Sequence, residues 1–188
     1  MHFVQTEWFW SMIQAIVVLV TLVFIYRQVR LQTATHVVQT LGAIHQRWAE
    51  DAMLRARHSV CSRYLAETFE FDGVSEYIAE FMEELGSYVK INAVPPDVMW
   101  DAQSWYIEHY YFMFKVGIDL VRKNYHDETL YSNTESLFSQ MTAHSKLVGA
   151  PSVERGPNDL RRFAENEVQI TAAFLNLQVH KQSALVAA

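Results

Sequence analysis

The chain has 188 residues, of which 51% are hydrophobic and 13% aromatic, and its formal net charge is −6. This length allows one domain with a sizeable core plus a short additional segment. The acidic balance excludes a general nucleic-acid binder, which would carry a basic face. The single cysteine, Cys61, excludes an intramolecular disulfide, and a lone thiol on a predicted helix is typically a small packing residue.

Residues 8–26 are predicted to span a lipid bilayer. They read WFWSMIQAIVVLVTLVFIY, without a charged residue, and as a helix they rise about 28 Å, close to the roughly 30 Å of bilayer hydrocarbon. Trp8, Trp10 and Tyr26 lie at the two ends, where aromatic rings favour the headgroup region. Gln14 is the most costly polar residue in this segment, and we expect it to face a partner helix.

A cleaved signal peptide is the alternative interpretation of this segment. Such a peptide has basic residues before a shorter apolar run, and small residues at a cleavage site after it. Residues 1–7, MHFVQTE, contain no Lys or Arg, and the apolar run is longer than that of a signal peptide. The pattern therefore favours an anchor.

Charges on either side of the span predict its orientation. Arg27 and Arg30 follow it directly, whereas Glu7 precedes it. The positive-inside rule then places the N-terminus outside and residues 27–188 in the cytoplasm, which in a bacterium means the inner membrane. The two arginines would meet anionic headgroups, at roughly 1 kcal/mol each.

The rest of the chain reads as helices separated by short loops. Helical spacing continues from the span as a stalk to about Ala66, and Phe71–Gly73 marks a turn. Helices follow at about 75–92, 97–124 and 132–148, and a last one begins at Asn158 after the loop at 149–157. Asp97 and Asn158 have the form of N-caps, and Ser132 with Glu135 that of a capping box. The apolar faces are formed by Ile78, Phe81, Met82, Leu85, Tyr88 and Val89 in one helix and by Leu160, Phe163, Ile170, Phe174 and Leu177 in the last.

The order of these segments resembles an uncharacterised family of small bacterial membrane-anchored helical proteins. A membrane helix runs into a basic stretch, IYRQVRLQT, and is followed by YIAEFMEELGSYVKINAV, an aromatic helix and LYSNTESLFSQM. The resemblance covers about residues 10–142. It implies a fold and a topology, and it carries no catalytic residues to transfer.

The helix at 97–124 is apolar on nearly all sides between Trp105 and Val116. One interpretation is a central helix that neighbours cover on several sides. The other is that one side is open and docks a partner or lies on the membrane, because exposed aromatic patches mark interaction sites. The candidate partner-binding residues on that side are Tyr111, Phe112, Phe114 and Ile118.

Two groups of residues resemble chemical sites, and the sequence predicts neither site. Glu108 and His109, with Glu80, Glu83 and Glu84 from the preceding helix, have the residue types of a metal site in a helical bundle, but no Glu-x-x-His pair occurs. Arg30 and His36 have the loose spacing found in helical ribonucleases, but they lie within two turns of the predicted membrane surface. We expect no metal, no cofactor and no nucleic-acid partner.

The sequence therefore predicts an all-α protein, in which an N-terminal transmembrane helix continues into a cytoplasmic bundle of four to five helices. Residues 1–30 form the anchor, 31–148 the helical domain, and 149–188 a loop and an amphipathic helix. The expected function is a non-enzymatic accessory, scaffold or assembly subunit beside other membrane proteins. The alternatives are a membrane-tethered effector or sensor, of the stress or phage-defence type, and a helical metal-dependent enzyme.

Overall fold

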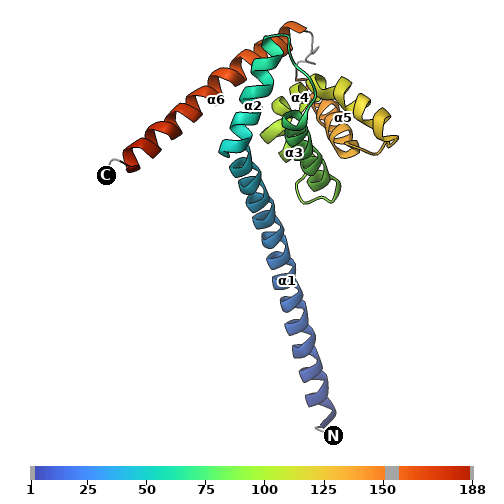
Figure 1. The fold of residues 1–188 in the computed structure, drawn as a ribbon. Coiled ribbons are helices and arrows are strands. Elements are labelled where there is room, and N and C mark those ends of the chain that lie inside the picture. The colour runs from blue at the N-terminus through green and yellow to red at the C-terminus, as the bar shows by residue number, and fades with distance from the viewer. Residues whose placement is uncertain (1–2, 151–156, 187–188) are drawn as a thin grey trace. The chain divides into compact units, whose positions relative to one another are not determined.

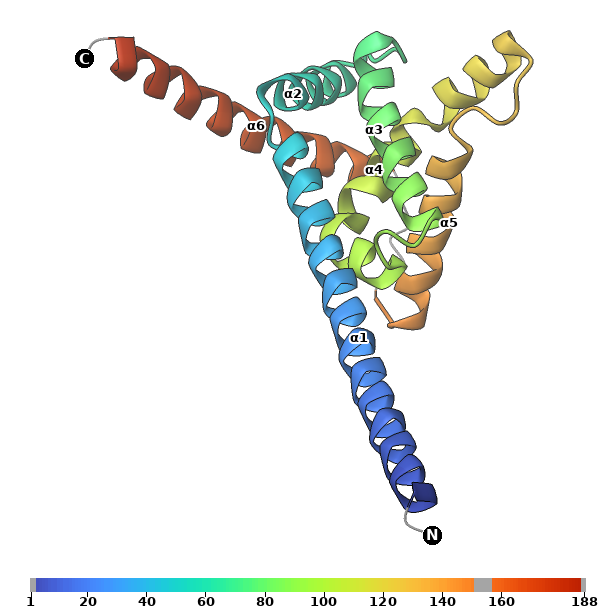
Figure 2. The same ribbon diagram turned by 90° about the horizontal axis from the view of Figure 1, so that it is seen from below.

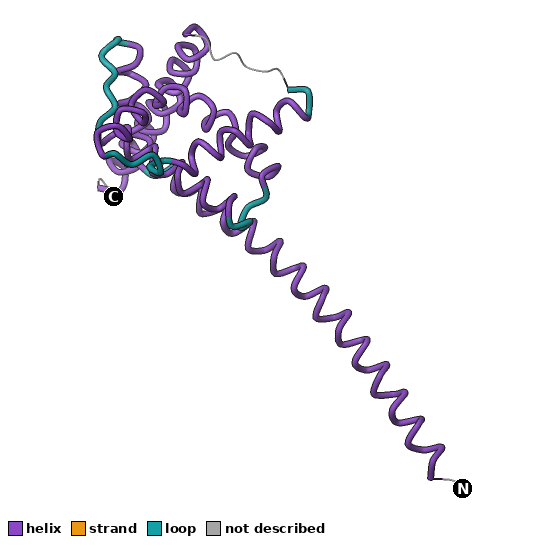
Figure 3. Tube along the Cα trace, turned by 90° about the vertical axis from the view of Figure 1, so that its right-hand side faces the viewer, coloured by secondary structure: helices purple, strands orange, loops and turns teal. Residues whose placement is uncertain are grey.

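The structure, a computed structural model, describes residues 3–150 and 157–186. Its six helices are α1 (Phe3–Trp48), α2 (Asp51–Leu65), α3 (Gly73–Lys90), α4 (Pro96–Tyr125), α5 (Ser132–Leu147) and α6 (Pro157–Val186). Only helices and loops occur in these residues (Figure 1, Figure 3). The all-α prediction is confirmed, and the five helices after α1 agree with the predicted four to five.

The chain divides into two compact units, Met1–Gly42 and Ala43–Ala188. Within the described residues α1 is the one helix long and apolar enough to cross a membrane. Its most apolar 18-residue window has a mean hydropathy of 2.2 and is 0% buried. By length and composition such a helix near the N-terminus is a membrane span or a signal sequence. The boundaries at residue 30, between anchor and helical domain, and at residue 148, between that domain and the C-terminal segment, stay predictions.

The stalk does not run on as one helix to Ala66, as the sequence predicted. Helix α1 ends at Trp48, Glu50 has extended backbone angles (φ −63°, ψ 146°), and α2 starts anew at Asp51. The turn leaves the carbonyl of Trp48 without its helical partner, and Nη1 of Arg57 donates to that oxygen at 3.2 Å. A residue of the next helix thus supplies the hydrogen bond that the Trp48 carbonyl loses at the break. The helix can therefore end there without a glycine or proline.

The core of the second unit is built from α2 to α6. Figure 1 and Figure 2 show α2 beside α6, and α5 beside α3. The largest fully buried side chains are Met53, Ile78, Phe81, Met82, Leu85, Met99, Ile107, Tyr110, Phe114, Leu137, Met141 and Phe163. The apolar face predicted for residues 75–92 is buried, apart from the half-buried Tyr88. In α6 Phe163 is buried but Phe174 is 53% exposed, and the side chain of Leu177 lies outside the described residues.

A carboxylate from α3 caps α5, so the predicted capping box at Ser132 is wrong. The residue before α5 is Tyr131, in a left-handed conformation (φ 57°), and Ser132 already lies in the helix. Two backbone N–H groups in the first turn of α5, those of Asn133 and Thr134, donate to the carboxylate of Glu83 at 3.1 and 2.8 Å. This cap joins two helices that the sequence pattern treats separately.

Two further caps differ from the sequence prediction because proline begins the helix. Helix α4 has Pro96 at its first position, so Asp97 lies inside the first turn. Helix α6 begins at Pro157, so Asn158 is also inside the helix. Proline suits this position because its missing N–H has no partner there in any case. Of the loop predicted at 149–157, residues 151–156 lie outside the described residues.

Candidate interaction surface and buried ionic network

A buried arginine–glutamate pair joins α2 to α6 in the second unit. Nε and Nη2 of Arg57 donate to the carboxylate of Glu167 at 2.8 and 3.0 Å. The two side chains are only 3% and 1% exposed. Burial alone lowers the pKa of Arg57, but the attraction of Glu167 outweighs it, so the pKa lies above its usual value. Arg57 therefore keeps its positive charge inside the bundle, against the carboxyl group of Glu167.

Helix α4 joins this pair through a phenol. The hydroxyl of Tyr110 donates to Glu167 at 3.1 Å and lies 3.6 Å from Sγ of Cys61. Burial raises the pKa of Tyr110 well above its usual value and the pKa of the Cys61 thiol to about 12. Both groups stay protonated at neutral pH. A thiol in this state is a poor nucleophile, which agrees with the packing role predicted for Cys61.

Aromatic rings enclose the guanidinium group of Arg57. It lies 4.1 Å from the ring centroid of Trp48 and 5.3 Å from that of Tyr106. Trp48 in turn contacts the rings of Phe81, Tyr106 and Tyr110. The arginine thus has a carboxylate, a carbonyl and two ring faces as partners, which together replace the water lost on burial. We interpret the network as a structural connection of α2, α4 and α6.

A second polar contact joins α4 to α6. His109 is fully buried, its Nδ1 lies 2.6 Å from the carbonyl of Trp105, and its Nε2 lies 3.2 Å from Oδ2 of Asp159. The imidazole also stacks on Phe163, with 4.3 Å between ring centroids. Both oxygens are hydrogen-bond acceptors, so the ring nitrogen that carries a proton donates to the oxygen beside it. His109 is therefore held by the fold on each side.

The open face of α4 is not the one predicted. Tyr111, Phe114 and Ile118 are buried, at 7%, 1% and 3% exposure, and so belong to the core. Phe112 alone of the four candidates is on the surface, at 38%. Four exposed apolar residues of α4 lie on one side of the helix and are hereafter called the α4 stripe: Trp105 (45%), Phe112 (38%), Val116 (80%) and Leu120 (57%). Tyr125, the last residue of α4, is exposed too.

The charged residues of α4 could have located this stripe. Lys115, Asp119 and Lys123 are exposed and lie on the same side of the helix as Val116. Charged side chains stay in water, so they mark the outer side of a helix whose apolar residues occur all round. The sequence prediction relied on the aromatic residues alone. It therefore chose a side that is mostly the inner one.

The predicted anchor residues are exposed on α1. Trp8, Trp10 and Tyr26 are 70%, 61% and 67% exposed. Arg27 and Arg30 are exposed too, as is Gln14. No hydrogen bond joins the carboxamide of Gln14 to any residue that the structure describes. These placements leave the whole surface of the predicted span available to lipid or to another helix.

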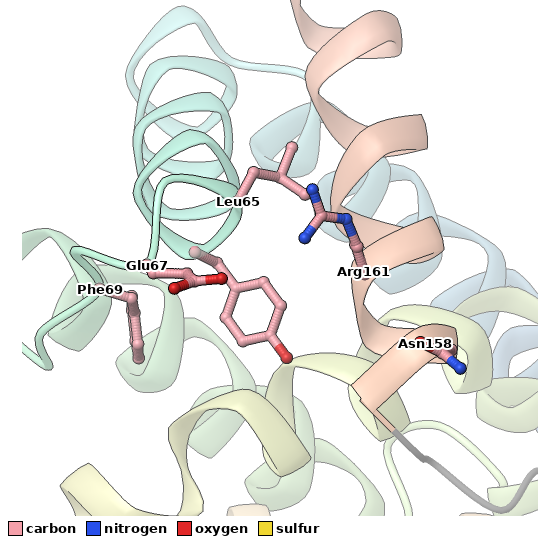
Figure 4. Close-up of a pocket in the computed structure, with 6 residues that line it drawn as sticks. Leu65, Glu67, Phe69, Asn158 and Arg161 are labelled. Atoms are coloured by element: carbon pink, nitrogen blue, oxygen red, sulfur yellow. The ribbon is translucent and has the colours of Figure 1, made fainter.

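Surface hollows of the second unit offer little chemistry. One of about 410 Å³ lies where α2 ends and α6 begins, lined by Tyr64, Leu65, Glu67, Phe69, Asn158 and Arg161 (Figure 4). The charges of Glu67 and Arg161 face the same hollow, and Arg161 also pairs with Glu165 at 3.3 Å. Opposite charges at one rim give no preference for the charge of a ligand.

The residues considered for a metal site are held apart. Glu83 caps α5, Glu84 pairs with Arg47, Glu108 accepts from the hydroxyl of Ser145, and His109 contacts Asp159. In residues 3–150 and 157–186 no group of three or more His, Cys, Asp or Glu side chains is arranged to hold a metal ion. Arg30 and His36, the pair with ribonuclease-like spacing, are both exposed on α1.

Comparison with known protein families, with curated proteins and with solved structures finds no match to this chain. Function must therefore be inferred from the residues of the chain itself.

Proposed function

We propose that the chain is a single-pass membrane protein that acts as a non-enzymatic accessory or assembly subunit. Helix α1 crosses the bilayer from residue 8 to 26, with the N-terminus outside and the folded unit in the cytoplasm, at the inner membrane of a bacterium. The observation that carries the proposal is the unburied window of α1, with a mean hydropathy of 2.2. Such a surface is stable in hydrocarbon and costly in water.

The α4 stripe is the proposed contact with another membrane protein. Val116 and Leu120 are branched apolar residues at 80% and 57% exposure, and Phe112 extends the same surface. An apolar row on a convex helix fits the groove of a partner protein better than it fits a small molecule, which needs a concave site.

Neither alternative function gains support from the second unit. A nucleic-acid-binding effector would need a basic cleft, but the arginines Arg47, Arg55, Arg57 and Arg63 pair with Glu84, Asp51, Glu167 and Asp72. A carboxylate thus neutralises each of these four positive charges. The positive electrostatic potential left to attract phosphate groups is therefore small. A metal-dependent enzyme would need the carboxylates of α3 as ligands, whereas Glu83 bonds to α5 and Glu84 pairs with Arg47.

Substitution in the stripe tests the proposal. We expect Val116→Lys to abolish stoichiometric co-purification of a membrane protein partner, because it places a charge at the centre of an apolar contact. The measurement is purification of the full-length protein in mild detergent, followed by native mass spectrometry. Ile91→Lys is the matched control, since Ile91 is 71% exposed at the end of α3. Loss with both variants, or a wild-type protein with no stoichiometric partner, contradicts the proposal.

A further inference from the structure

Polar residues recur along α1 at a spacing of seven. One row consists of the polar residues Gln14, Thr21, Gln28 and Thr35. A second row has the polar residues Ser11, Gln32 and Gln39, with the apolar Val18 and Ile25 at the two positions between Ser11 and Gln32. The two rows are staggered by three and four residues, as the core positions of a coiled coil are. Every one of these residues is exposed. We refer to Ser11, Gln14, Val18, Thr21, Ile25 and Gln28 as the heptad rows of the span.

Contact with water explains only the later part of this pattern. After Arg27 a helix of a soluble protein keeps polar residues on its outer side, and Gln32 and Gln39 need no other reason. Inside residues 8–26 there is no water to select such a side. Ser11, Gln14 and Thr21 are nevertheless in register with the later glutamines. Solvent does not explain why the polar residues of the span lie in the same rows as the later glutamines. Contact with a second helix along these rows does.

Gln14 defines what that helix must provide. The hydroxyl of Thr21 donates to the carbonyl of Val17 at 2.8 Å, so it is satisfied within its own helix. The carboxamide of Gln14 has two donor hydrogens and an acceptor oxygen, and no residue that the structure describes bonds to it. In hydrocarbon an unpaired amide costs several kcal/mol by transfer from water. A partner must therefore present both a donor and an acceptor at the depth of Gln14.

A second copy of this chain meets that requirement directly. In a parallel pair related by a twofold axis, each residue of the rows faces its own counterpart, so Gln14 meets Gln14 at the same depth. An amide is complementary to another amide. We propose that α1 crosses the membrane as a parallel pair with α1 of a second copy, joined along the heptad rows of the span in a left-handed supercoil.

The charges beside the span are compatible with this pairing. Arg27 and Arg30 fall outside both rows, at the third and sixth positions of the repeat that starts with Ser11. The pair therefore does not bring like charges to its centre. Ile44 and Trp48, which are buried in the second unit, also fall outside the rows.

Disulfide cross-linking of the full-length protein tests the pairing, which rests on α1 spanning a membrane. The protein is inserted into vesicles of phosphatidylcholine and phosphatidylglycerol and oxidised with copper phenanthroline. Val18→Cys and Ile25→Cys lie in the rows, and Ile16→Cys and Val23→Cys are the controls. The four side chains are similarly exposed, at 57%, 50%, 51% and 60%. Wild-type protein is a second control, because its Cys61 is buried.

We expect the two row variants to form covalent dimers about tenfold faster than the two controls. In the Val18→Cys background, Gln14→Leu should lower the rate several-fold, because the buried amide pair is lost. Three outcomes would overturn the pairing and leave the membrane anchor intact: equal rates at all four positions, faster rates at the controls, or no dimer from protein that resists carbonate extraction. Protein that carbonate releases from the vesicles would overturn the membrane anchor as well.

Discussion

Glu167→Gln is expected to be among the most destabilising single substitutions in the second unit, by about 3–5 kcal/mol. The change keeps the shape of the side chain but removes the charge that compensates Arg57, whose side chain is 3% exposed. Tyr110 also loses its charged acceptor. The measurement is thermal unfolding of full-length protein in mild detergent, followed by near-ultraviolet circular dichroism. The midpoint should fall by on the order of 10 °C.

Two controls separate this effect from a general effect of losing a carboxylate. Glu165→Gln breaks the pair with Arg161 on the same helix, where both side chains are more than half exposed, and should change stability by less than about 0.5 kcal/mol. The double variant Arg57→Met with Glu167→Leu should recover most of the loss, because no buried charge remains. A loss from Glu167→Gln no larger than that from Glu165→Gln would show that the pair is not buried as described.

Gly86→Ala is the second large effect, with an expected loss of about 2–3 kcal/mol. A Cβ at Gly86 would overlap the backbone carbonyl and the Cβ of Asn133, in the first turn of α5. Backbone atoms cannot rotate away as the end of a side chain can, so α3 and α5 must separate. Separation also weakens the cap that Glu83 provides to α5. These costs exceed the gain of about 1 kcal/mol that alanine brings inside a helix.

Gly73→Ala provides the matched control, because a Cβ there meets nothing within 4 Å and the residue begins the same helix. Its stability should equal or slightly exceed that of the wild type. The same unfolding experiment compares the two variants. If Gly86→Ala is as stable as Gly73→Ala, then α3 and α5 do not cross as closely as the structure shows.

The sequence predicted best those helices whose apolar residues lie on one face. In residues 75–92 the face from Ile78 to Val89 is regular, and the glutamates lie largely off it, so the helix and its buried side follow from periodicity. The connection at Tyr125–Asp127 was also predicted correctly, because His126 takes the left-handed conformation that ends α4.

Features that depend on distant residues could not be predicted. The break after Trp48 is satisfied by Arg57, and the cap of α5 comes from Glu83. Capping rules consider only residues within a few positions of a helix end. Arg57, the donor, and Glu83, the acceptor, both lie farther along the chain from the helix ends that they cap. In the last helix, the buried face includes Glu167 and Thr171. A face chosen by hydrophobicity omits both, because a charged residue is buried only where a partner such as Arg57 meets it.

The α4 stripe shows the same limit at a candidate site. Phe112 was predicted to be exposed and is, but Tyr111 and Phe114 are in the core and Val116 was not considered. Aromatic residues all round a helix do not identify its outer side, since they pack equally well inside. The charges of Lys115 and Asp119 carry that information, because they must reach water.

Membrane fractionation tests the central claim most directly. Full-length protein with a C-terminal tag is expressed in a bacterium, and the membranes are washed with alkaline carbonate, treated with protease in inverted vesicles, and analysed by intact mass spectrometry. We expect the protein to stay in the membrane pellet with residues 1–26 still attached, and the folded unit to be digested in inverted vesicles. A variant lacking residues 1–26 should be released. Release of the full-length chain by carbonate, or a mature protein that has lost this segment, would contradict a membrane anchor.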